Sequence, residues 1–93
     1  MAALPEVIHN TAESRFEMTV DGHLSVAEYH LRDGRMVFTH TFVPPELRGR
    51  GIAERLVLAG FRHAREYGYR IVPQCSYVAV LLARRPEFQD LAA

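Results

Sequence analysis

The sequence has a single cysteine, Cys75, and no long apolar run. One cysteine excludes an intrachain disulfide and any zinc or iron–sulfur site built from several cysteines, and it favours a reducing compartment. No stretch approaches the roughly 18 apolar residues of a membrane span, and the first residues lack the basic and apolar regions of a secretory signal. We therefore expect a cytoplasmic protein.

An excess of charge of either sign is also absent. Eleven lysine and arginine residues balance eleven acidic residues, so the formal net charge is zero. This balance removes the broad positive field on which non-specific nucleic-acid binding depends. We expect neither nucleic acid nor a membrane as partner. His9, His23, His30 and His63 lack metal-ligand spacing, and we expect no metal site.

The composition that remains is that of one small globular domain. The chain has 93 residues, of which 48% are apolar and 24% charged. A chain of this size buries about two-thirds of its unfolded surface, which suffices for one thin core. We expect a single domain over residues 1–93, with residues 1–12 forming either a frayed end or an edge strand.

Alternating apolar and polar residues predict three β-strands, at 15–20, 23–31 and 35–43. Asp-Gly pairs separate the strands and are typical of tight hairpin turns, so the three strands should be antiparallel. Pro44-Pro45 ends the third strand, since neither proline can donate a hydrogen bond to a sheet.

The second half of the chain predicts a mixture of helix and strand. Apolar residues recur every three or four positions over 51–67, which predicts a helix that Gly68 ends. A fourth strand is predicted at 69–72 and a second helix at 77–85. The order β-β-β-α-β-α indicates a mixed α/β (α+β) fold, in which a right-handed crossover makes the fourth strand parallel to the third.

The loop before the long helix has the sequence Arg48-Gly-Arg-Gly51. Glycines let a backbone approach a ligand closely, and the first N–H groups of a helix lack intrahelical acceptors. Together with the helix dipole and the two arginines, this loop could hold a pyrophosphate. It could equally be a solvated loop, because a short glycine pattern is a weak signal.

Several segments together resemble a known superfamily. Arg48-Gly-Arg-Gly-Ile-Ala53 resembles the pyrophosphate loop of the GNAT superfamily of N-acetyltransferases. With Thr39-His-Thr41, Val72-Pro-Gln-Cys75 and Arg85-Pro-Glu-Phe88, it is similar to the minimal, single-domain acetyltransferase-like group of that superfamily, over residues 15–91. The resemblance implies a small GNAT-like fold and direct transfer of acetyl from acetyl-coenzyme A to an amine, in an open cleft suited to an exposed lysine or peptide.

The resemblance also implies where acetyl-coenzyme A would bind. Its pantetheine arm would pair with the end of the third strand, its pyrophosphate would rest on the loop amides, and an N–H near Val43 would donate to the thioester carbonyl. Arg84 and Arg85 could reach its 3′-phosphate or merely complement the dipole of their helix. The cofactor-binding residues expected on this basis are Thr41, Phe42, Val43, Arg48, Gly49, Arg50, Gly51, Ile52 and Ala53.

The sequence departs from its relatives at one catalytic position, because Phe42 stands where a glutamate commonly follows His-Thr. Alternation puts His40 on the same face as Met36, Phe38 and Phe42, and His40 is the expected general base, unless its role is structural.

Two residues after the fourth strand are further candidates. Cys75, near a helix N-terminus, could take the acetyl group or protonate the leaving thiolate, or could be a small buried residue. Tyr77 could act as general acid, although packing alone also explains it.

Two other functions stay open. Phe42 favours a coenzyme A-binding module or sensor with little transferase activity. The other is a small interaction domain that binds no cofactor. In that case replacing Gly51 with glutamate would leave all function intact.

Overall fold

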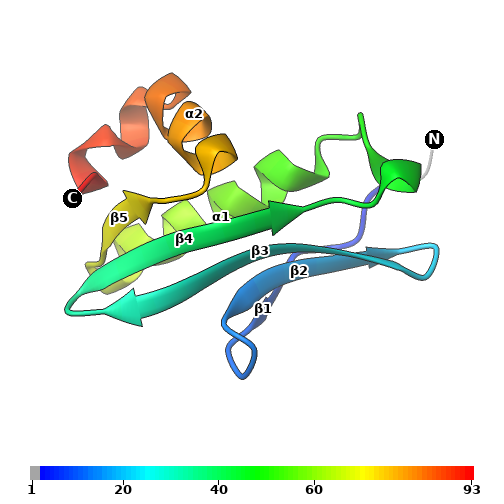
Figure 1. Ribbon diagram of the computed structural model, residues 1–93, viewed down its shortest axis with the longest axis horizontal. Helices are drawn as coiled ribbons and strands as arrows, with labels where there is room; N and C mark the ends of the chain where they lie inside the picture. Colours follow the sequence, from blue (N-terminus) through cyan, green and yellow to red (C-terminus); the bar gives the residue numbers. More distant parts are fainter. Residues whose placement is uncertain (1–2) are drawn as a thin grey trace.

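The computed structural model describes residues 3–93 and contains one five-stranded sheet with helices packed against it (Figure 1). The sheet has the order β1-β2-β3-β4-β5. Its strands are β1 (Ile8–Asn10), β2 (Arg15–Val20), β3 (His23–Arg32), β4 (Arg35–Phe42) and β5 (Arg70–Pro73). The helices are α1 (Ile52–Tyr67), α2 (Ser76–Arg84) and two short 3₁₀ helices, η1 (Pro45–Leu47) and η2 (Pro86–Leu91).

The predicted mixed α/β fold is confirmed. β4 and β5 are parallel and the other neighbouring strands are antiparallel. Asp21-Gly22 and Asp33-Gly34 have positive φ at both residues, which is the conformation of a type I′ hairpin turn. Among residues 3–93, no helix has the length and apolar character that crossing a membrane requires.

The core lies between α1 and one face of the sheet. Phe16 and Phe38 on the sheet are buried, and the Phe38 ring meets Phe61 of α1 edge to face, with 5.6 Å between ring centroids. Gly60 makes this approach possible, because a Cβ at this position would lie 2.7 Å from Phe38 Cε1. α1 therefore lies close behind the sheet in Figure 1, while α2 and η2 cover the edge formed by β5.

A β-bulge divides β4 into two parts. Tyr29 pairs with Phe38 and Glu28 pairs with His40, so Thr39 is left out of the register, although its hydroxyl donates to the Glu28 carbonyl at 3.4 Å. Ala27 shares the α1 face with Tyr29, and its partner is Thr41. Thr41 therefore continues the face of Phe38 beyond the bulge.

The prediction of strict alternation along this strand is thus wrong. His40 and Phe42 pair with Glu28 and Val26, and these residues alternate with those that face α1. His40 still shares a face with Phe42, but that face points away from α1 and from Phe38. The extra residue at the bulge reverses the alternation.

Candidate functional site

The site forms where β4 and β5 separate. Their parallel pairing ends at Phe38 and Pro73, and the Cys75 N–H then donates to the Phe38 carbonyl at 3.0 Å. β5 stops there, whereas β4 continues to Phe42. The end of β4 therefore has backbone groups that the neighbouring strand does not pair, which an extended ligand could use.

A cleft of about 240 Å³ opens between the end of β4 and the start of α1. It contains six of the nine predicted cofactor-binding residues together with Tyr77, whereas Thr41, Phe42 and Arg50 do not line it. The lining residues are Val43, Leu47, Arg48, Gly49, Gly51, Ile52, Ala53, Glu54 and Tyr77.

The glycines of the loop give the cleft its floor of backbone amides. Gly49 has φ +84° and Gly51, the N-cap of α1, has φ +76°. Both therefore have the left-handed backbone conformation that glycine adopts readily. A Cβ at either position would meet no atom within 4 Å, so conformation rather than crowding favours glycine. Among residues 3–93, the amides of residues 49–54 have no hydrogen-bond acceptor. These free donors at a helix N-terminus suit a diphosphate.

The arginines around the cleft differ in their contacts. Arg48 Nε donates to the Val43 carbonyl at 3.1 Å and ties the loop to the end of β4. Arg85 pairs with Glu54 at the rim of the cleft and with Glu87 at 3.6 Å. Arg50 is exposed and has no ion pair within residues 3–93. Neither loop arginine has an ion pair within residues 3–93, and Arg50 also makes no side-chain hydrogen bond there.

Glu54 is a cleft residue that the sequence prediction missed. The expected cofactor-binding residues end at Ala53, but Glu54 also lines the cleft and pairs with Arg85. An acidic residue in the first turn of a helix is a signal for a stabilising contact there. Its partner lies 31 positions away in the sequence and could not be identified from spacing.

Cys75 is a half-buried thiol at the N-cap of α2. Its Sγ lies 3.5 Å from the Thr41 hydroxyl. Burial raises the pKa of the thiol, but hydrogen bonds with the Thr41 hydroxyl and with the amides of Tyr77 and Val78 outweigh burial, so the pKa lies below its usual value. This environment makes the sulfur more reactive than an ordinary buried cysteine.

Tyr77 lies in the first turn of α2 and contributes to the cleft wall. Burial, and then the Glu54 carboxylate, raise the pKa of its hydroxyl, against the smaller effect of Arg84 and Arg85. The hydroxyl therefore keeps its proton at neutral pH and can donate it.

The structure does not bring His40 into the cleft. His40 is exposed on the sheet face away from α1, and its neighbour Phe42 is 42% exposed on the same face. Thr41, between them, points to the α1 side and contacts Cys75. The candidate base and the candidate acids thus lie on opposite faces of β4, at the point where β4 leaves β5.

The contact between Thr41 and Cys75 predicts a reactivity change. Thr41→Val removes a hydrogen bond that lowers the pKa of the thiol, so the pKa should rise and the thiolate fraction near neutral pH should fall. We expect alkylation by iodoacetamide to slow several-fold at about pH 8, and to converge with the wild-type rate at high pH, where both thiols are ionised. Thr39→Val, at the bulge, is the control. Equal rates for the two variants at every pH would exclude the contact.

Comparisons with known proteins show the family and the fold of this chain. Residues 15–91 match the family model of the GCN5-related N-acetyl-transferases. The fold is also similar to the NMR solution structure of a GCN5-like candidate N-acetyltransferase from Staphylococcus aureus, with a TM-score of 0.76 and 28% sequence identity. That match covers 95% of this chain and 87% of the other.

Proposed function

The chain belongs to the GCN5-related N-acetyltransferase family and is thereby an acyltransferase, and we propose that it transfers acetyl from acetyl-coenzyme A to an exposed amine. The observation that carries this proposal is the cleft, in which free amides at the start of α1 meet the unpaired end of β4. We propose that residues 1–93 act as one domain in a reducing, cytoplasmic compartment, with neither a metal nor a nucleic-acid or membrane partner.

In this proposal the cleft residues hold acetyl-coenzyme A. The amides of residues 49–53 bind the pyrophosphate, and Arg48 and Arg50 add positive charge. The end of β4, residues 41–43, pairs with the amide-bearing arm, and the Val43 N–H donates to the thioester carbonyl oxygen. The bound thioester supplies the activated acetyl group.

The catalytic residues move two protons. A new C–N bond forms between the acceptor amine and the acetyl carbon, and the C–S bond breaks. His40 takes the proton that the amine loses. Tyr77 or Cys75 gives a proton to the leaving thiolate, and the protonated hydroxyl of Tyr77 favours it as the donor.

The acceptor in this proposal is the amine of a lysine or of a peptide that is exposed on a partner. One face of the sheet carries His40, and none of the described helices covers that face over β1, β2 and β3 (Figure 1). An extended chain can therefore reach this face. The chain itself contains no lysine, since all eleven of its basic residues are arginine. Any acetyl-lysine found in an assay therefore belongs to the added acceptor.

Two measurements test the proposal. Calorimetry with acetyl-coenzyme A should give a binding signal at micromolar to millimolar ligand, the usual range of KM values. Thiol release with a panel of lysine peptides, corrected for hydrolysis, should exceed the rate in buffer. A lack of heat at millimolar ligand would exclude acetyl-coenzyme A. Binding without thiol release would support the alternative function, a coenzyme A-binding module. Phe42 favours that alternative because it stands in place of the usual glutamate.

Cys75→Ala separates direct attack from a covalent relay. Direct attack predicts a rate close to the wild-type rate, because Tyr77 remains as proton donor. A relay through an acetylated thiol predicts that transfer stops, since the sulfur would form and then lose the bond to acetyl. Mass spectrometry of the wild-type chain after mixing with acetyl-coenzyme A alone supplies a second measurement, because only the relay adds an acetyl group to Cys75.

A further inference from the structure

The face of the sheet away from α1 carries a carboxylate directly beside His40. Glu28 of β3 pairs with His40 of β4 in the register, and the two side chains point to the same face. Directly opposite residues on antiparallel strands have Cβ atoms about 4.5–5.5 Å apart, a distance that a glutamate and an imidazole can bridge. The bulge at Thr39 creates this pair, because without it Glu28 would face another residue of β4.

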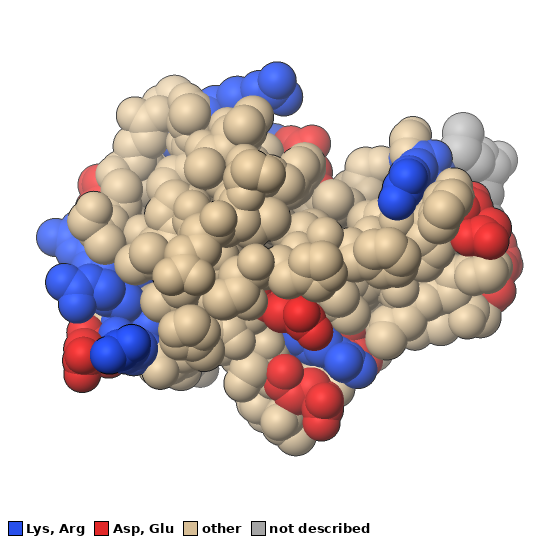
Figure 2. Space-filling model, in the orientation of Figure 1, with Lys and Arg blue, Asp and Glu red and all other residues tan. Residues whose placement is uncertain are grey.

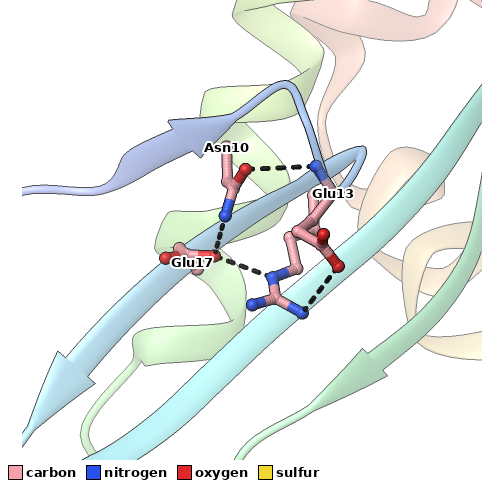
Figure 3. Close-up of polar contacts among 4 residues, drawn as sticks. Asn10, Glu13 and Glu17 are labelled. Atoms are coloured by element: carbon pink, nitrogen blue, oxygen red, sulfur yellow. Dashed lines mark hydrogen bonds and ion pairs between the residues drawn. The ribbon is translucent and has the colours of Figure 1, made fainter.

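Glu28 is the acid on this face that is not engaged elsewhere. Glu17, on β2, accepts hydrogen bonds from Arg15 Nε at 2.7 Å and from Asn10 Nδ2 at 3.0 Å. Figure 3 shows this cluster, with Glu13 beside it, in front of the sheet. Arg15, the β2 partner of Glu28, is thereby held by Glu17 and lies 4.0 Å from Glu13. Within residues 3–93 the Glu28 carboxylate has neither a hydrogen bond nor an ion pair.

The register makes Glu28 the charged residue next to His40 across the strands. On its own strand the neighbour on this face is Phe42, and beyond Glu28 the next charged group is Arg15 of β2. In Figure 2, a group of acidic and arginine side chains lies just below the middle of the molecule, and further charged side chains lie toward its left and right edges. Arg15, the charged neighbour of Glu28 on β2, already donates to Glu17 at 2.7 Å.

We propose that Glu28 positions His40 for catalysis and thereby supplies, from β3, the carboxylate that Phe42 removes from β4. Within residues 3–93 the two side chains are adjacent in the register but not hydrogen-bonded, so this role requires the Glu28 side chain to turn toward the ring. Its carboxylate would then accept one ring N–H of His40, which would fix the tautomer and leave the other ring nitrogen free to take the amine proton. The carboxylate also stabilises the imidazolium that this proton creates. Glu28 itself forms no bond with the substrate, so it is a positioning residue.

The test rests on the proposed transferase function and compares kcat with KM. Glu28→Gln should lower kcat about tenfold or more, with KM for acetyl-coenzyme A unchanged, and Glu28→Asp should restore part of the loss. Glu17→Gln is the matched control, a carboxylate on the same face held by other partners, and it should leave kcat near the wild-type value. In a His40→Ala background, Glu28→Gln should have no further effect, because Glu28 acts through His40.

Several outcomes would overturn this role. They are an unchanged kcat for Glu28→Gln, an equal loss for Glu17→Gln, or a second tenfold loss in the His40→Ala background. The ¹⁵N chemical shifts of the His40 ring give a readout without turnover: one tautomer should dominate in the wild type and a mixture should appear in Glu28→Gln. If no acceptor is acetylated but this shift occurs, the proposed function fails and the pairing stands. If the spectra are identical, the pairing fails.

Discussion

Replacing Gly51 with glutamate should abolish binding of acetyl-coenzyme A while the chain still folds. The carboxylate would lie among the amides that are proposed to hold the pyrophosphate, and it would repel that group. Losing two charge-assisted hydrogen bonds of about 1.5 kcal/mol each corresponds to about a 100-fold weaker affinity, before repulsion is added. Calorimetry should therefore detect no binding at ligand concentrations that saturate the wild type.

Two variants separate this effect from backbone strain. Gly51 has φ +76°, and any other residue there costs about 1–2 kcal/mol. Gly34, in the hairpin at the opposite end of β4, has φ +77° and the same open surroundings. Gly34→Glu should therefore lose similar stability and bind normally, and Gly51→Ala should lose stability with only a modest loss of affinity. Normal binding by Gly51→Glu would contradict the role of the loop.

The elements that local chemistry determines could be predicted from the sequence. A type I′ hairpin turn requires positive φ at both central residues, which Asp-Gly pairs tolerate well, and both hairpins form where those pairs occur. The apolar stripe of α1 is buried and its end at Gly68 is left-handed. Helix and strand boundaries shift by about one residue, as when α2 begins at Ser76, because the ends of elements depend on tertiary contacts.

The arrangement of the candidate site could be predicted only in part. The loop at 48–53 combines two glycines with a helix start, and these features are local. The bulge at Thr39 has no glycine or proline to mark it, so the faces of His40 and Thr41 could not be assigned. The contact of Thr41 with Cys75 joins residues 34 positions apart. Such contacts depend on how β4 and β5 separate, which composition does not show.

Replacing His40 with alanine is the second change for which we expect a large effect. Turnover should fall, while binding of acetyl-coenzyme A should stay the same. A lysine amine has a pKa of about 10.4, so its deprotonation at pH 7 costs about 4.6 kcal/mol. A positioned base typically contributes about 10²–10⁴-fold to a rate. We expect His40→Ala to lower kcat within this range at neutral pH, with the affinity for acetyl-coenzyme A unchanged, because His40 lies outside the cleft.

The pH dependence distinguishes a base from a structural histidine. As the pH rises toward the pKa of the acceptor amine, solvent removes the proton and the enzyme's base matters less, so the difference between His40→Ala and the wild type should narrow. His30→Ala, which removes another exposed strand histidine, should leave both kcat and its pH profile unchanged. A structural role for His40 would instead lower stability and reduce kcat by the same factor at every pH. A constant ratio of the two rates would therefore show that another group takes the proton from the amine. The residues around the cleft would then be the candidates for the general base.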